Sequence, residues 1–179
     1  MPTQVFSFAD NGPPGYTVLR RRTVLGKGRA IFQRATEAMF KYEMIDRLSW
    51  AKMVVLPDSD ELATVVRCYG CFWSFNPSRQ VCAFKNRRVQ VADLLGGGAR
   101  PMVSQVAYST LEGHLIAGEE RFRVVLDTHS GSVTFEALSF TRGAGWLGRV
   151  AMPLIRPLQH NFFRETGRAM LAAVQTEES

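Results

Sequence analysis

The stretch "WLGRVAMPLIRPLQHNFFRETGRAMLAAVQ", residues 146–175, decides the fold of this chain. Its apolar residues recur at every third or fourth position while arginines take the other faces, a spacing typical of an amphipathic helix. The apolar stripe comprises Leu147, Val150, Ala151, Leu154, Leu158, Phe162, Ala169 and Ala173. Pro153 and Pro157 each remove a helix donor, so we expect them to kink the helix or divide it into a short leading piece and a main helix that begins near Pro157.

Strand patterns fill the region before this helix, from Leu62 to Arg142. The β-branched and apolar runs are residues 61–75, 79–91, 102–111, 119–127 and 132–142. Short turn signals separate them: Asn76-Pro77-Ser78, Gly96-Gly97-Gly98, Glu112-Gly113 and His129-Ser130-Gly131. Connections this short suit an antiparallel meander, because parallel strands need crossover helices.

The N-terminal part supplies the remaining elements. A turn-rich leader, residues 1–15, precedes a predicted strand at Tyr16–Leu25 and a helix that extends to about Glu43. The glycines of "GKG" at 26–28 form a connection between them, and residues 44–61 read as a short second helix or turn followed by a loop.

This order of elements predicts an α+β fold in a single domain, residues 16–175, with a frayed tail at 176–179. An antiparallel sheet with one apolar face has to cover that face, and the terminal helix is the only element large enough to do so. The predicted architecture is a curved sheet wrapped around the long C-terminal helix. This is the helix-grip, or START-like, arrangement, which commonly leaves an apolar cavity between sheet and helix.

The composition places the chain among ordinary globular proteins. Its 179 residues are 46% hydrophobic and 21% charged, enough for one core without a covalent staple. The net charge of +6 comes mostly from scattered arginines without interleaved aromatics, so we expect no nucleic-acid partner. The start does not read as a signal peptide and no apolar run of about 18 residues occurs, so the sequence predicts a cytoplasmic protein without a transmembrane segment.

The cysteines and histidines do not form a metal motif. The CxxC pair Cys68 and Cys71 has no second pair after it and is flanked by β-branched and aromatic residues, which favours small buried thiols on or beside a strand. The 3 histidines lie in different predicted elements. We therefore expect no metal and no cofactor.

The segment "EGHLIAGEERF", Glu112–Phe122, holds the candidate catalytic residues. Period two directs Glu120 toward the apolar face and Glu119 toward solvent. Burial would raise the pKa of Glu120 and suit it for general acid or base work, with His114 as partner if the loop folds back. In the alternative interpretation, His114 caps the turn through backbone hydrogen bonds and Glu120 binds a buried arginine or loop amides.

Three stretches resemble a known family. They are "GYTVLRRRTVLGKGRAIFQRA", "YSTLEGHLIAGEERF" and "GSVTFEALSFTRGAGWLGRVAMPLIRPLQHNFFR". They are similar to the bacterial and plant family catalogued as domain of unknown function 1990, over about Gly15 to Ala172. The matching motif positions are His114, Gly118, Glu119, Glu120 and Phe122, whereas Ile116 stands where the family usually has an acidic residue. The resemblance implies the fold and no particular reaction.

The sequence leaves three functional hypotheses. The first is binding of an apolar or amphipathic small molecule in the cavity between sheet and helix. The predicted lining is Phe72, Trp73, Tyr108, Phe122, Phe135, Phe140, Leu158 and Phe162, with Glu136 as a further polar candidate. The second is an enzyme with the same cavity, a cyclase, isomerase or dehydratase acting on a polyketide-like or isoprenoid-like substrate through Glu120 and His114. The third is an interaction protein that uses its arginine-rich surface; the identity of the ligand and the oligomeric state are not predicted.

Overall fold

The computed structural model describes residues 13–89 and 101–175. Most of the predicted leader, the Gly96-Gly97-Gly98 loop and the tail at 176–179 lie outside the described residues. The strands are β1 (Thr17–Lys27), β2 (Ala51–Val55), β3 (Glu61–Cys68), β4 (Phe72–Arg88), β5 (Met102–Thr110), β6 (Ile116–Leu126) and β7 (Ser132–Gly143). The helices are α1 (Arg29–Phe40), α2 (Glu43–Asp46) and α3 (Gly145–Gln175).

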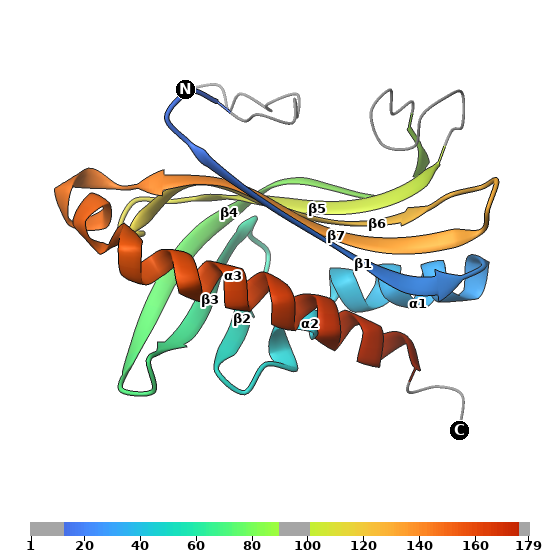
Figure 1. Cartoon of the computed structure of the whole chain (residues 1–179), viewed down its shortest axis with the longest axis horizontal. Coiled ribbons are helices and arrows are strands. Elements are labelled where there is room, and N and C mark those ends of the chain that lie inside the picture. Colours follow the sequence, from blue (N-terminus) through green and yellow to red (C-terminus); the bar gives the residue numbers. More distant parts are fainter. Residues whose placement is uncertain (1–12, 90–100, 176–179) are drawn as a thin grey trace.

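The strands form one seven-stranded antiparallel sheet in the order β1-β7-β6-β5-β4-β3-β2. Figure 1 shows that β3 and β4 bend away from the long strands, so that the sheet curves, and that α3 runs along its concave side. The two ends of this strand order, β1 and β2, remain unpaired with each other, so the sheet is open.

The register of the strands divides the sheet into two faces. On the concave face, alternate residues such as Phe122, Val124 and Phe135 are fully buried and belong to one hydrophobic core. The core also takes Phe32 and Met39 from α1 and the C-terminal half of α3. Both short helices and that half of α3 therefore cover one part of the concave face, and only the first half of α3 faces the other part.

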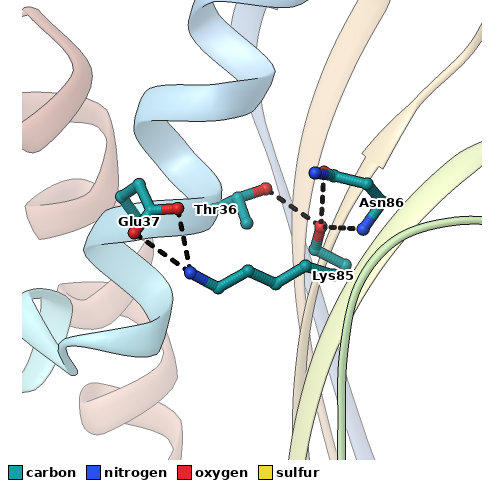
Figure 2. A network of polar contacts seen from close by, with 5 residues as sticks. Thr36, Glu37, Lys85 and Asn86 are labelled. Atoms are coloured by element: carbon teal, nitrogen blue, oxygen red, sulfur yellow. Dashed lines mark hydrogen bonds and ion pairs between the residues drawn. The ribbon is translucent and has the colours of Figure 1, made fainter.

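Polar contacts fix α1 to the sheet (Figure 2). The buried hydroxyl of Thr36 donates to Ser104 Oγ over 3.1 Å, and the backbone amide of Asn86 donates to the same oxygen over 3.0 Å. At the rim of this contact, Lys85 Nζ lies 2.9 Å from Glu37 Oε1. These bonds satisfy polar groups that would be costly to bury alone.

Two details of the strand prediction are wrong. The predicted loop contains β2, and the turn predicted at Asn76-Pro77-Ser78 lies inside β4. The chain reverses instead at Tyr69 and Gly70, whose φ values are 50° and 76°. Strand geometry explains why proline is tolerated. The Pro77 carbonyl accepts from the Leu111 amide just beyond the end of β5, and the N–H that proline lacks would point to the same side, so no hydrogen bond to β3 is lost.

The terminal helix begins one residue before the predicted start and ends at the predicted Gln175. It is not divided, because helix continues through Pro153 and Pro157. The carbonyls deprived of a donor belong to Arg149 and Pro153 on exposed turns, where water can replace the lost bonds. The α+β helix-grip architecture predicted from the element order is confirmed.

No helix in residues 13–89 and 101–175 combines the length and apolar character needed to cross a membrane.

Candidate functional site

A cavity of about 500 Å³ lies between the concave face of the sheet and the first half of α3. Its wall is mainly apolar. The apolar and aromatic lining residues are Trp50, Val66, Tyr69, Phe72, Leu115, Ile116, Ala151, Leu154, Ile155, Leu158, Phe162 and Phe163. The volume and lining are those of a site for a small organic molecule.

Polar groups also line the cavity. They come from β3, β4, β5, β6, β7 and α3: Thr64, Ser74, Asn76, Ser78, Tyr108, Thr110, Glu119, Glu120, Thr141 and Gln159. Several are tied to one another, as where Gln159 Nε2 donates to Thr141 Oγ1 over 3.3 Å. A molecule in the cavity would therefore meet mainly apolar side chains from α3 and most of its hydrogen-bonding groups on the sheet.

Glu120 is an acidic group in the wall of the cavity. It lies opposite Tyr108 in the β5–β6 register, and the Tyr108 hydroxyl donates to Glu120 Oε1 over 2.9 Å. Burial raises the pKa of Glu120 to about 7, although the hydrogen bond from Tyr108 pulls it down. Near neutral pH the carboxyl group therefore exists in both protonation states, as a general acid or base requires.

His114 lines the same cavity from the β5–β6 loop. Its Nδ1 accepts a hydrogen bond from the Ile116 amide over 3.1 Å, so the neutral ring carries its proton on Nε2. Burial lowers the pKa of His114 to about 4, which keeps the ring neutral at pH 7. Among the described residues no hydrogen bond joins His114 to Glu120, so the two line one cavity without forming a dyad.

The predicted cavity residues divide into those that reach the cavity and those that do not. Phe72, Tyr108, Leu158 and Phe162 line it. Phe122 and Phe135 stack on each other in the core, with ring centroids 5.7 Å apart, and are not among the described lining residues. Aromatic character alone did not separate the packed part of the concave face from the hollow part.

Three predicted side chains lie on the convex face. Trp73 pairs with Arg67 on the outer side of the β3–β4 hairpin and is 61% exposed, so it is not part of the cavity wall. Phe140 and Glu136 alternate with the concave residues of β7 and point away from the cavity. The prediction that these three side chains line the cavity is therefore wrong, because the strand register turns them to the convex face.

Glu136 holds a cluster of arginines on the convex face. Its carboxylate lies 2.7 Å from Arg22 Nε and 2.5 Å from an Arg123 terminal nitrogen, with Arg20 and Arg121 within 4 Å. Glu119, predicted to lie in solvent, is only 9% exposed. The strand register places it on this face, and it also borders the cavity. Burial raises the pKa of Glu119 and Arg121 opposes that shift, so this side of the sheet is a packed charged layer and not a solvated surface.

The cysteine pair is split by the hairpin turn. Cys68 ends β3 and is buried, as predicted, whereas Cys71 lies in the turn and is exposed. The prediction of two buried thiols is thus wrong for Cys71, because the turn falls between the two residues. Within residues 13–89 and 101–175, no group of three metal-ligating side chains occurs.

The polar wall supplied by β4 was missed. Ser74, Asn76 and Ser78 alternate with apolar or aromatic neighbours at period two, the signal of a strand with one polar face. The Asn-Pro-Ser turn signal in the same segment predicts a turn instead. Asn76 Nδ2 donates to the Thr64 carbonyl over 2.9 Å, which holds this wall in place.

The family is established by comparison with known sequences. The family model described as "Domain of unknown function (DUF1990)" matches residues 3–169, so the chain belongs to this family. A UPF0548 protein of Deinococcus radiodurans is 30% identical over 86% of this chain and 76% of its own length. A UPF0548 protein of Arabidopsis thaliana is 25% identical over 89% of this chain and 74% of its own length.

Solved structures share the fold at low identity. The Zhui aromatase/cyclase from a Streptomyces species has a TM-score of 0.59 at 11% identity, over 92% of this chain and 96% of its own. Norcoclaurine synthase from Thalictrum flavum has a TM-score of 0.55 at 14% identity, over 92% of this chain and 97% of its own. These likenesses show a START-like fold.

Proposed function

We propose that the protein binds an apolar or amphipathic small molecule in the cavity between the sheet and α3. The observation that carries the proposal is the cavity itself: about 500 Å³, walled mainly by apolar side chains, with the hydrogen-bonded pair Glu120 and Tyr108 in its wall. Such a site fits a ligand whose body is apolar and whose hydroxyl, carbonyl or amine group meets the carboxyl.

Blocking the cavity tests this function. Ala151 lies on α3 and lines the cavity, so Ala151→Trp fills the space with an indole ring. The matched control is Ala172→Trp, at an exposed position near the C-terminal end of the same helix. We expect native mass spectrometry to find a copurifying small molecule, or a polarity-sensitive dye to bind, in the parent protein and the control but not in Ala151→Trp.

The proposal is overturned if Ala151→Trp binds the dye and the copurified molecule as well as the parent protein does. Equal losses in both tryptophan variants would also overturn it, because the loss would then come from the added ring and not from the cavity.

A second candidate function is catalysis in the same cavity. The specific observation in its favour is the pKa of about 7 at Glu120, together with a neutral His114 whose Nε2–H is a donor. Glu120 would take a proton from the substrate and return it elsewhere, while His114 would hold an oxygen of the substrate by hydrogen bonding. An aromatase/cyclase and a synthase among the proteins of similar fold make cyclisation, isomerisation or dehydration of a polyketide-like or isoprenoid-like molecule the reaction class to assay.

Glu120→Gln separates the two candidates. It keeps the shape of the side chain and an acceptor for Tyr108, so a binding protein retains its ligand. An enzyme loses turnover while still binding. Glu37→Gln is the matched control, because Glu37 is an exposed glutamate of α1 that does not belong to the described cavity lining.

A further inference from the structure

The first turns of α3 present apolar side chains to solvent. Trp146, Val150 and Leu154 follow one another at intervals of four residues and are 76%, 71% and 63% exposed. This spacing puts them on one face of the helix, with the exposed Leu147 beside them. Leu154 also lines the cavity, so the exposed face is continuous with the face that forms the cavity wall.

The tip of the β3–β4 hairpin extends this surface. Tyr69 and Phe72 are more than half exposed and also line the cavity. The Tyr69 hydroxyl donates to the Leu154 carbonyl over 2.7 Å, which fixes the tip against the helix. We call the six residues Tyr69, Phe72, Trp146, Leu147, Val150 and Leu154 the apolar rim, since they border the mouth of the cavity.

The charges near the apolar rim are almost all positive. Neither residues 62–92 nor residues 143–164 contain an aspartate or glutamate, whereas Arg67, Arg149 and Arg156 are exposed in these segments. Glu112 in the β5–β6 loop is an exposed carboxylate of opposite charge. The whole chain carries a net charge of +6. An apolar patch bordered by arginines complements a partner that has an apolar interior and an anionic outer layer.

We propose that the apolar rim docks the protein on the surface of an anionic lipid bilayer, with the mouth of the cavity turned toward the acyl chains. Trp146 and Tyr69 supply rings suited to the level of the lipid head groups, and Arg149 meets the phosphates. A ligand would then pass between bilayer and cavity without crossing water. That last step rests on the proposed ligand-binding function, whereas docking itself does not.

The charges argue against a second copy of the chain as the occupant. A two-fold interface through the apolar rim would bring each copy's rim arginines, such as Arg149, toward those of the other. Residues 143–164 of neither copy contain a carboxylate that could neutralise them. A bilayer rich in phosphatidylglycerol offers a negative charge on each such lipid instead.

Vesicle binding tests the proposal. Full-length protein is sedimented with vesicles of phosphatidylcholine alone or with phosphatidylcholine and phosphatidylglycerol in comparable amounts, at low and high salt. We expect binding to the anionic vesicles only, weakened by salt, with a shift of tryptophan emission to shorter wavelength. Trp146→Ser combined with Val150→Ser should lower the partition coefficient about tenfold or more, because two apolar side chains no longer enter the lipid.

The matched control is Val24→Ser combined with Val54→Ser, two exposed valines on strands away from the apolar rim. It should bind vesicles like the parent protein. No binding to anionic vesicles, or equal losses in both double variants, would overturn the proposal. Light scattering that finds a dimer which Trp146→Ser with Val150→Ser converts to a monomer would also overturn it, by assigning the surface to a second copy. Dye binding in the cavity is measured on the same variants, so failure of docking and failure of ligand binding are told apart.

Discussion

The hydroxyl of Tyr108 donates to the carboxyl of Glu120 over 2.9 Å, from directly across the β5–β6 ladder. The pair lines a mostly apolar cavity, where burial shifts the Glu120 carboxyl group toward its neutral form. The cavity beside this pair has room for another molecule. The Glu120 carboxyl group could give a proton to that molecule or take one from it. Because both side chains belong to the protein itself, the pKa of Glu120 and the free energy of unfolding can be measured before any ligand is known.

Glu120→Gln should stabilise the protein above neutral pH. Burial raises the pKa of Glu120 from 4.5 to about 7, so its carboxyl favours folding below pH 4.5 and opposes it increasingly as pH rises through 7. The change amounts to on the order of 3 kcal/mol. Urea unfolding at pH 8 should therefore show a larger free energy of unfolding for Glu120→Gln than for the parent protein, with little difference at pH 4.5. A variant less stable than its parent at pH 8 would mean that the carboxylate holds the hairpin together.

Tyr108→Phe should raise the pKa of Glu120 above about 7. The hydrogen bond from Tyr108 stabilises the carboxylate, and its loss leaves desolvation unopposed. The midpoint can be followed by carbon NMR of the glutamate carboxyl. Tyr42→Phe is the control, because its hydroxyl donates to Gln80 Oε1 and not to Glu120. An unchanged midpoint in Tyr108→Phe would show that the hydroxyl does not act on the carboxyl in solution.

His114→Asn should make the free energy of unfolding fall less as the pH is lowered. Burial lowers the pKa of His114 from 6.5 to about 4, so the neutral ring favours folding above pH 6.5, and this contribution is lost as pH falls to 4. The loss is on the order of 3 kcal/mol, and asparagine retains an acceptor for the Ile116 amide. The free energy of unfolding should fall less between pH 6.5 and 4 in the variant than in the parent protein. His160→Asn, at an exposed histidine of α3, should leave the profile unchanged.

Glu136→Gln should be the most destabilising of these changes. Its carboxylate is buried among four guanidinium groups, and the amide would leave them without their shared counter-charge. We expect a loss of roughly 3–5 kcal/mol in urea unfolding at pH 7. Glu61→Gln, in the exposed pair with Arg79, should cost about 0–1 kcal/mol. Equal small effects at both sites would contradict a structural role for Glu136.

The sequence allowed much of the fold to be predicted, for physical reasons that particular elements make clear. The period of α3 and the alternation in β6 reflect burial on one face, which composition reveals directly. The direction of Glu120 followed from the same alternation. The turn at Tyr69 and Gly70 was not predicted, because Asn76-Pro77-Ser78 is a stronger local turn signal and only the pairing with β3 and Leu111 shows why it stays extended.

The candidate site was harder to predict, because it depends on where packing stops. Phe122 and Phe162 are both aromatic and buried, but only Phe162 borders the cavity. That distinction is made by α1 and α2, which fill one part of the concave face and leave the other part open. The predicted stripe on α3 likewise contains Leu147, Val150 and Leu154, which lie where no partner within the described chain covers them fully.

The continuity of α3 determines how the mouth of the cavity can open. Met170 and Val174 anchor its C-terminal half in the core, so the helix cannot leave the sheet as a rigid rod. Pro153 and Pro157 each omit one backbone hydrogen bond within the part of α3 that lines the cavity. The helix can therefore bend at these two positions while its C-terminal half stays packed in the core. We expect amide hydrogens of residues 147–152 to exchange with deuterium much sooner than those of residues 163–174.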